Sequence, residues 1–415
     1  MILTTIFQLK PFYNSVQASG VWHALDGSWL REVRERIPIF SRKVYLDTAG
    51  AGPLTLDVKD AVEGFLELWN SEGEPWGEAL DDILESRRLF AQMVGAKVEE
   101  VAAVPGVTYG LNAFLSSLKL PPDSNVVVSE TNFPTGVYTF HAMARRGLIR
   151  EVRIASASDG CVGLDGFERL IDDSTSIVYV DMVSWITGCR EDLRTLAELA
   201  HSHGALMVSD VFHAAGVYPI DVKKLGLDAA FTGSYKWLLG LHGGGFAYVS
   251  EELLPSLEPM FSGWMAIDDS VMERMARGDP LFSRPFNVRE FRRASDAKVL
   301  EWGTWPAIAF VSLKASLKML SAYDAPGLYA SHTGRLVKRL IDSLTDMGVE
   351  TVTPRGMAAG IVVFRHRHPE RLGRFLESRG IVASVRPGSV RVSIHFYNSR
   401  EDVEALLRAL EEFRG

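Results

Sequence analysis

Seven short apolar segments, separated by stretches of helical periodicity, dominate the middle of this 415-residue chain. This alternation predicts a mostly parallel sheet covered by helices on both faces, because parallel strands need long crossover connections. The predicted strands are 101–105, 125–129, 151–154, 176–182, 206–210, 228–232 and 245–249. The predicted helices between them are 107–118, 134–146, 165–171 and 191–203. We therefore expect an α/β fold built on a seven-stranded sheet.

The last third of the chain has a different pattern. Trp305-Pro306 opens a predicted helix that runs to about Tyr323, and the turn pair Pro326-Gly327 closes it. Beyond it, two helices alternate with the predicted strands 349–353, 359–364 and 389–394, which together suggest a small α+β domain. Residues 251–300 fit neither pattern, and they suit an irregular segment over a site as well as a plain surface excursion. The expected domains are 1–60, an N-terminal arm contributing to the small domain, 61–300, the large domain, and 301–415, the small C-terminal domain.

Lys236 is the strongest candidate for chemistry. It follows the apolar strand Ala229 to Thr232 and lies between Tyr235 and Trp237, so its amine is expected to be poorly solvated. Desolvation lowers the pKa of an amine, and a neutral amine can attack a carbonyl and form a Schiff base. A lysine that merely keeps its amine in water at the surface is the alternative.

Asp210 ends the apolar run Leu206-Met-Val-Ser. A carboxylate at the carboxyl end of a central strand points into the crevice where open α/β sheets bind ligands. It could also simply cap the following turn. Together with a lysine at the next strand end, Asp210 suggests pyridoxal phosphate, which needs a lysine for covalent attachment and an acid that keeps its ring nitrogen protonated.

Two further segments fit a phosphate and a flat ring. Val101 to Thr108 passes through a Pro-Gly turn into a helical pattern, and free amides at a helix start suit a phosphate dianion. Thr108 could equally be an ordinary helix cap. Phe133 follows the strand 125–129, where it could stack on a pyridine ring or belong to the core.

Taken together, these segments resemble the class V aminotransferase-type pyridoxal-phosphate enzymes of fold type I. That group includes cysteine desulfurases, kynureninases and isopenicillin N epimerase-like proteins. The resemblance runs from Tyr45-Leu-Asp-Thr-Ala-Gly-Ala-Gly-Pro53 to Val390-Arg-Val-Ser-Ile-His-Phe-Tyr-Asn398, and so covers nearly the whole chain. It implies a large domain with a mostly parallel seven-stranded sheet, a smaller α+β C-terminal domain and a homodimer.

The resemblance also implies roles for individual residues. The expected catalytic residues are Lys236 (the aldimine lysine), Asp210 (at the ring nitrogen) and His213 (near the phenolic oxygen). The expected phosphate-binding and ring-stacking residues are Val107, Thr108, Phe133, Ser234 and Tyr235, with Thr304 reaching the phosphate of the partner subunit. Gly233 stands where the family often has a hydroxyl, so Ser234 or Thr232 is expected to supply it. The expected substrate-binding residues are Arg391, for the α-carboxylate, and Ala51.

A class V aminotransferase is the activity that we rank first. A pyridoxal-phosphate β-lyase, such as a cysteine desulfurase-like C–S lyase, comes second, an amino-acid epimerase third and kynureninase lower. A non-catalytic binding protein of the same fold is the alternative from another class. Desulfurases carry a nucleophilic cysteine before the final arginine strand, but 381–391 contains none, so persulfide chemistry is disfavoured.

Composition agrees with a globular cytoplasmic enzyme. Apolar residues make up 47% and charged residues 23%, and a net charge of −8 argues against a nucleic-acid surface. Cys161 and Cys189 lie far apart, give no disulfide framework and fit a reducing cytosol. No signal peptide or membrane span is expected. The pairs His201/His203 and His366/His368 lack a third ligand, so no metal site is expected.

Overall fold

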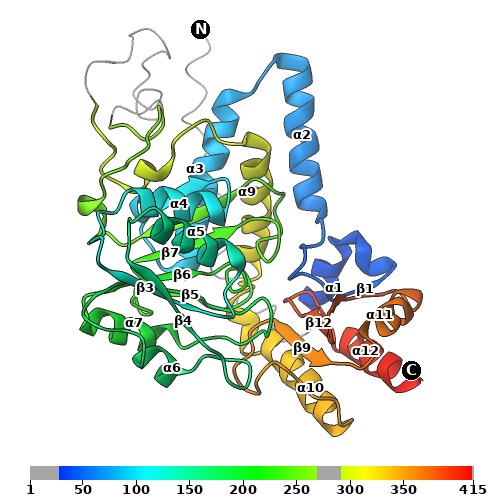
Figure 1. The fold of residues 1–415 in the computed structure, drawn as a ribbon. Coiled ribbons are helices and arrows are strands. Elements are labelled where there is room, and N and C mark those ends of the chain that lie inside the picture. Colours follow the sequence, from blue (N-terminus) through cyan, green and yellow to red (C-terminus); the bar gives the residue numbers. More distant parts are fainter. Residues whose placement is uncertain (1–27, 269–290, 414–415) are drawn as a thin grey trace.

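The computed structural model describes residues 28–268 and 291–413, and a seven-stranded sheet of order β2-β8-β7-β6-β5-β3-β4 forms its centre (Figure 1). The strands are β2 Val101–Val104, β3 Asn125–Ser129, β4 Glu151–Ala155, β5 Thr175–Asp181, β6 Leu206–Asp210, β7 Ala229–Gly233 and β8 Gly245–Val249. Strand β8 is antiparallel to both of its neighbours, and the other pairs are parallel. The predicted α/β fold with a mostly parallel sheet is confirmed.

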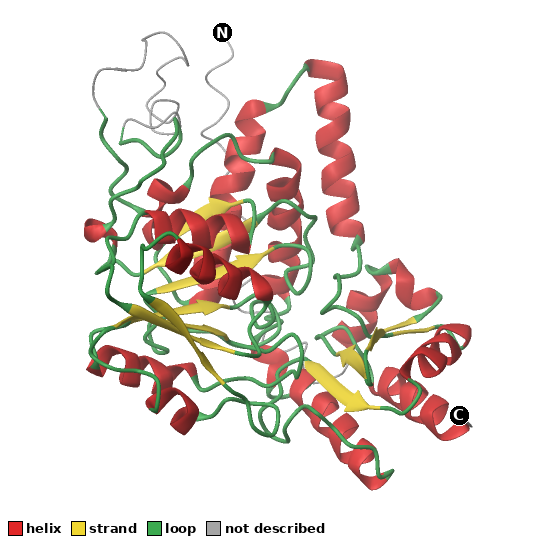
Figure 2. Cartoon of the chain, viewed as in Figure 1, coloured by secondary structure: helices red, strands yellow, loops and turns green. Residues whose placement is uncertain are grey.

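Helices cover both faces of this sheet (Figure 2). Their bounds are α3 Trp76–Val94, α4 Val107–Ser116, α5 Pro134–Arg145, α6 Leu164–Glu168, α7 Leu193–Ser202 and α9 Ala307–Ala322. Successive strand residues point to opposite faces, so Val126 and Val128 pack in the cluster with Phe114 of α4, while Val127 packs with Phe90 of α3. All residues of β3, β7 and β8 are buried, as expected for strands covered on both faces.

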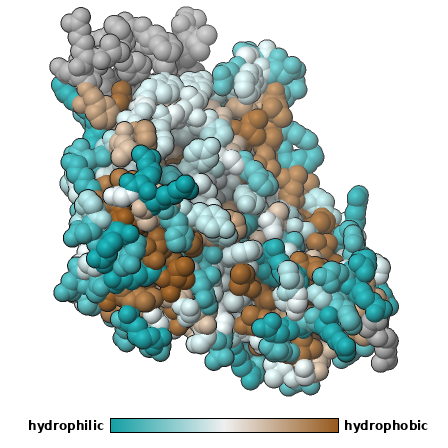
Figure 3. Space-filling model, viewed as in Figure 1, coloured by the Kyte–Doolittle hydropathy of each residue, from teal (hydrophilic) through white to brown (hydrophobic). Residues whose placement is uncertain are grey.

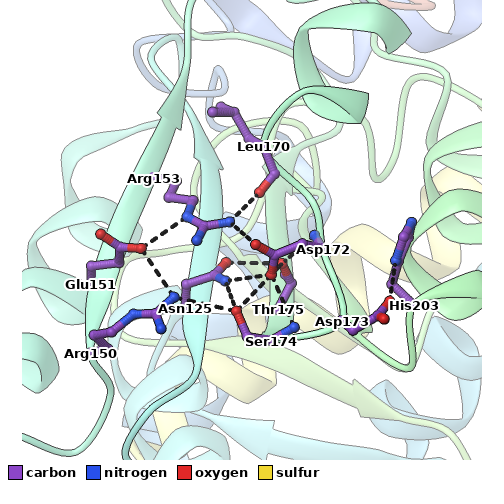
Figure 4. Close-up of polar contacts among 10 residues, drawn as sticks. All are labelled: Asn125, Arg150, Glu151, Arg153, Leu170, Asp172, Asp173, Ser174, Thr175 and His203. Carbon is purple, nitrogen blue, oxygen red and sulfur yellow. Dashed lines mark hydrogen bonds and ion pairs between the residues drawn. The ribbon is translucent and has the colours of Figure 1, made fainter.

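The amino ends of β3, β4 and β5 are joined by a polar network (Figure 4). Asp172 accepts hydrogen bonds from Ser174, from Asn125 of β3 at 3.1 Å and from Arg153 of β4 at 2.6 Å. The hydrogen bond from Ser174 and then that from Arg153 lower the pKa of Asp172 below its usual range. The network links the three strands at this end of the sheet, and the cavity described below lies at the opposite, carboxyl ends.

The small domain is built on the three-stranded sheet β11-β12-β9. Its elements are β9 Ile361–Arg365, β10 Ile381–Val382, β11 Ser384–Arg386, β12 Ser389–Ser393, α10 Thr333–Asp346, α11 Pro369–Ser378 and α12 Arg400–Glu412. The N-terminal part of the chain supplies α1 (Ser28–Glu35) and β1 (Val44–Tyr45), and β1 pairs in parallel with β10.

The predicted strand 349–353 is wrong. This segment makes a single bridge, between Thr351 and Phe364, and no regular strand. The Thr353 hydroxyl accepts the backbone N–H of Val363 at 2.8 Å and donates to the carbonyl of Thr187. A side chain therefore takes a hydrogen bond that a strand would make with its backbone.

The long helix predicted after Pro306 is present as α9, and it packs against α3 and against α2 (Leu56–Glu72) of the large domain. We therefore propose that the domain boundary lies after α9 rather than at residue 301. In the described parts of 251–300 the helical elements are the short 3₁₀ turns Leu254–Ser256 and Ala297–Leu300, and residues 269–290 lie outside the described residues. Among the described helices, none is long and apolar enough to cross a membrane.

Cys161 and Cys189 form a disulfide, so the expectation of two unpaired cysteines is wrong. Cys161 follows β4 and Cys189 follows β5, and the carboxyl ends of parallel strands come together at one edge of the sheet. Their Cα atoms are 5.7 Å apart although 28 residues separate them in sequence. These cysteines therefore give no support for a reducing compartment.

Candidate active site

A cavity of about 230 Å³ lies at the carboxyl ends of the central strands. Its lining residues are Pro105, Gly106, Val107, Thr108, Tyr109, Phe133, Thr135, Asp181, Asp210, Phe212, His213, Gly233, Tyr235, Lys236, Gly243 and Gly244. This is the position where open α/β sheets bind ligands. The structure thus brings together Lys236, Asp210, His213, Phe133 and the start of α4, which are separated by up to about 130 residues in sequence.

Lys236 follows β7 and is buried. Its Nζ lies 4.5 Å from the centre of the Phe212 ring and 5.8 Å from that of Phe133. Burial lowers the pKa of Lys236 to about 8; the negative charge of Asp210 opposes this shift and the positive charge of Arg391 adds to it. A substantial fraction of this amine is therefore neutral near pH 8, as a nucleophile or a base requires.

His213 has its tautomer fixed by Trp237. The indole Nε1–H of Trp237 donates to Nδ1 of His213 at 3.0 Å, and an indole nitrogen can only donate. Nδ1 must therefore be the acceptor, and the ring proton lies on Nε2, which is 3.2 Å from Nζ of Lys236. Burial first, and then the charge of Lys236, lower the pKa of His213 well below its usual value. His213 is accordingly a neutral donor that points at the lysine.

His395 links the small domain to the same loop. Its Nδ1 accepts the backbone N–H of Phe396 at 2.8 Å, so its Nε2–H donates to the carbonyl of Trp237 at 2.9 Å. Burial lowers the pKa of His395 to about 4. The residue after the lysine is therefore held at its side chain by His213 and at its carbonyl by His395.

Two carboxylates lie side by side beneath the cavity. Asp181 at the end of β5 is the register partner of Asp210 at the end of β6. Asp210 accepts the backbone N–H of Phe212 at 2.7 Å, and Asp181 accepts that of Phe133 at 2.6 Å. Burial raises the pKa of Asp210 to about 6, and burial together with the charge of Asp210 raises that of Asp181 well above its usual range. Neither carboxylate forms an ion pair with a described residue, so a cation bound in the cavity would be stabilised by them.

The start of α4 forms another part of the lining. Gly106 precedes the helix at φ 150° and has no side chain to cap the first amides. Val107 and Thr108 follow, and the Thr108 hydroxyl lies 3.3 Å from that of Thr135. Free amides at the positive end of a ten-residue helix favour an anion such as phosphate. Tyr235 also lines the cavity and stacks on His242 at 3.8 Å between ring centres.

Arg391 lies on β12 and is almost fully buried. Its NH1 donates to the carbonyl of Trp185 at 3.1 Å, and its NH2 is 3.7 Å from Asp47. Burial lowers its pKa to about 10. Trp185 packs edge to face on the lining residue Phe133 at 5.4 Å, so Arg391 is linked to the cavity wall through Trp185 but does not itself line the cavity.

Some of the expected site residues lie elsewhere. Ser234 is buried outside the cavity lining, and its hydroxyl donates to the carbonyl of Leu241. Thr304 is exposed and does not line the cavity of its own chain. Ala51 is near the lysine loop, because the adjacent Gly52 donates its N–H to the carbonyl of Tyr235 at 2.8 Å.

Sequence reasoning missed Asp181, Phe212 and Trp185, and it placed Trp237 beside the lysine without its hydrogen bond to His213. Asp181 had a detectable signal, since it ends a strand just as Asp210 does. Phe212 and Trp185 had none, because a tryptophan or phenylalanine beside a motif is usually a core residue. Their roles depend on contacts made only in the folded chain.

The lining fits the pyridoxal phosphate that the sequence leads us to expect. No described carboxylate lies within ion-pair distance of Nζ of Lys236, so its amine is available for the cofactor's aldehyde. The buried acid Asp210 can accept from a protonated ring nitrogen, and the uncapped start of α4 can take the phosphate. His213 presents a fixed Nε2–H toward the lysine, as a ring oxygen would require.

Comparison with known proteins gives a match over most of the chain. The Aminotransferase class-V family model matches residues 44–406. The uncharacterized aminotransferase YcbU of Bacillus subtilis (strain 168) is 26% identical over 375 residues, covering 90% of this chain and 95% of that protein.

Solved structures show the same fold. The apo cysteine desulfurase of Thermococcus onnurineus NA1 superposes with a TM-score of 0.79 at 23% identity, covering 92% of this chain and 97% of that one. A C-DES variant with glycine covalently linked to its pyridoxal-phosphate cofactor also has a TM-score of 0.79, at 19% identity, covering 92% of this chain and 99% of that one.

The Trp237–His213 contact can be tested through the tautomer of His213. In protein labelled with ¹⁵N-histidine, we expect the His213 signal, identified by its loss in His213→Asn, to show Nε2–H and no titration between about pH 6 and 8. Trp237→Phe removes the indole N–H, whose hydrogen bond requires an unprotonated Nδ1 on His213. We expect both tautomers to appear and the pKa of His213 to rise by about one unit, since a hydrogen bond contributes about 1 kcal/mol.

Trp29→Phe is the matched control, because Trp29 is a buried tryptophan of α1 in the same apolar core, and no contact with His213 is found for it. It should leave the His213 signal unchanged. A wild-type His213 that carries its proton on Nδ1, or that titrates near neutral pH, would show that the tryptophan does not set the tautomer.

Proposed function

Because this chain belongs to the aminotransferase class-V family, we propose that it is a pyridoxal-phosphate-dependent aminotransferase that acts on an L-amino acid. Its cofactor is pyridoxal phosphate. The single observation that carries the proposal is Lys236, a buried amine with its pKa lowered to about 8, 3.2 Å from a neutral histidine and close to a pair of buried carboxylates. Such an amine can hold the cofactor's aldehyde and can later move a proton.

Bound pyridoxal phosphate supplies an electron-withdrawing ring that acidifies the α-proton of an attached amino acid. Asp210 would hold the ring nitrogen in its protonated form, because its carboxylate is buried and has no cationic partner of its own. The first turn of α4 and Thr108 would hold the phosphate, and Phe133 would pack against the ring. Arg391 would orient the substrate through its α-carboxylate. Lys236 would accept the α-proton at Nζ.

The placement of the bases supports transamination over epimerization. Epimerization needs proton transfer on both faces of the α-carbon, whereas transamination needs one base that moves a proton between two neighbouring carbons on one face. Among the cavity-lining residues, the nitrogen bases are Lys236 and His213, and they touch each other. Phe133, an apolar ring, lines the cavity as well.

The cysteines argue against persulfide chemistry. The sequence has two cysteines, and both are engaged in the Cys161–Cys189 disulfide. Strands β11 and β12 are joined directly through Pro387 and Gly388, so the hairpin before Arg391 offers no thiol. A C–S lyase that needs no enzyme thiol is the second candidate, and an assay with and without an amino acceptor separates it from an aminotransferase.

Lys236→Ala tests the covalent attachment. The wild-type protein incubated with pyridoxal phosphate should be yellow, and borohydride should leave a reduced adduct on the peptide containing Tyr235 and Trp237. Lys236→Ala should show no adduct and lose about 10³-fold or more in turnover, because a general base contributes about 10²- to 10⁴-fold. The exposed Lys224→Ala should retain both properties. A colourless wild-type protein, or an adduct on another peptide, refutes the proposed chemistry.

The reaction type can be decided with a panel of L-amino acids, each assayed with and without a keto-acid acceptor. For an aminotransferase, sustained keto-acid formation should depend on the acceptor, because transamination moves the amino group from the donor to an acceptor and stops without one. Keto acid and sulfide released without an acceptor would instead identify a C–S lyase, and racemization without keto acid would identify an epimerase.

We further propose that the active form is a homodimer in which Thr304 completes the partner's phosphate site. Thr304 is exposed and lies outside its own cavity. Leu56, Leu66 and Trp69 of α2 are 38%, 45% and 41% exposed, and Figure 3 shows hydrophobic surface along this helix. Sedimentation velocity at assay concentration should find a dimer of 45.9 kDa chains. A fully active monomer would contradict this assembly.

A further inference from the structure

The β11–β12 hairpin places two arginines on one face. Ser384 is directly opposite Arg391, so their side chains lie on the same side of the hairpin. Arg386 is two residues after Ser384 on the same strand and therefore points to that side as well. Arg386 and Arg391 are thus diagonal neighbours on the hairpin. Residues in this relation lie roughly 7–8 Å apart, a distance that long side chains can span.

Both arginines contact Trp185, whose ring packs on Phe133 of the cavity wall. The charges of Arg391 and Arg386 each contribute to lowering the pKa of Lys236 and of His213. The guanidinium carbon of Arg386 lies 5.5 Å from the centre of the Trp185 ring, and the Trp185 carbonyl accepts from Arg391. Trp185 therefore contacts Arg386 through its ring and Arg391 through its backbone carbonyl.

Arg391 has partners within its own chain, whereas Arg386 has none among the described residues that neutralises it. Asp47 forms an ion pair with Arg391 at 3.7 Å, and the Arg391 guanidinium also donates to the Ser384 hydroxyl at 3.5 Å. Among the described residues, none gives Arg386 a hydrogen bond or an ion pair. The Nε atoms of both arginines are buried without a hydrogen-bond partner. Two adjacent like charges with unpaired buried donors are costly unless an anion completes the site.

A single substrate carboxylate cannot pair with both Arg386 and Arg391. The α-carboxylate of an amino acid occupies the free edge of one guanidinium, since a bidentate pair engages two parallel N–H groups. If it binds Arg391, the donors of Arg386 remain unpaired. A second anionic group on the substrate side chain would pair them.

We propose that the substrate is an amino acid with an acidic side chain, whose α-carboxylate binds Arg391 and whose side-chain carboxylate binds Arg386. Arg386 is then the residue that determines specificity for a dicarboxylic amino acid. For the α-carboxylate, the assignment rests on the proposed function. For the side-chain carboxylate, it rests on Arg386, which is unpaired among the described residues.

The test compares isosteric substrates on the pyridoxal-phosphate-loaded protein. The half-reaction is followed by the cofactor's absorbance, without acceptor, for L-aspartate against L-asparagine and L-glutamate against L-glutamine. At least one acid should exceed its amide by about 10- to 100-fold in the apparent second-order rate constant of the half-reaction, the effect of a hydrogen bond to a charged group. Arg386→Gln should remove most of this preference by slowing the acid and leaving the amide nearly unchanged, and Arg386→Lys should restore part of it.

Arg379→Gln is the matched control, because Arg379 is a half-exposed arginine paired with Glu412. It should leave the preference of the wild type intact. Amides that react as well as the acids, or an Arg386→Gln variant that slows both equally, would overturn the assignment while leaving the aminotransferase proposal standing.

Binding provides a readout that does not depend on turnover. Calorimetry should show that the dianion glutarate binds more tightly than the monoanion butyrate, and that Arg386→Gln abolishes the difference. This result would support the paired arginines even if no amino acid were transaminated. Equal binding of the two anions by the wild-type protein would refute them.

Discussion

The parallel alignment of β5, β6 and β7 is the constraint on which the site depends. It brings the ends of three strands to one edge of the sheet, so that Asp181, Asp210 and the loop carrying Lys236 meet without any long connection. Their burial between two helical layers then sets their chemistry. Desolvation lowers the pKa of the amine and raises those of the acids, which moves all three toward the pH at which protons can be exchanged.

The acids and the arginines of this site lie on different elements. The acids Asp181 and Asp210 end β5 and β6 and line the cavity without an ion-paired cation, whereas Arg386 of the β11–β12 hairpin has no ion-paired anion among the described residues. A ligand with a cationic ring at one end and a carboxylated amino acid at the other satisfies both. The unpaired groups of the protein thus describe the charge pattern of the cofactor with its substrate.

The sequence predicted the sheet, its strand positions and seven of the sixteen residues that line the cavity, because strand ends, a glycine turn and a lysine between aromatic residues are local signals. It did not predict that Asp181 pairs with Asp210, since strand register is decided by packing. The disulfide between Cys161 and Cys189 was missed because two loops at one sheet edge are distant in sequence. The predicted strand 349–353 is absent because the Thr353 hydroxyl, rather than a backbone carbonyl, accepts the N–H of Val363. The roles of Thr304 and Ala51 remain predictions from resemblance.

The two tryptophans of the site explain how the small domain is tied to the chemistry. Trp237 accepts from His395 and Trp185 accepts from Arg391, each through its backbone carbonyl, at 2.9 and 3.1 Å. Their side chains also reach the large domain, where Trp237 donates to His213 and Trp185 packs on Phe133. Each ring has a small-domain neighbour as well, His395 for Trp237 and Arg386 for Trp185. Movement of the small domain would therefore displace both the histidine beside the lysine and the ring at the cavity wall.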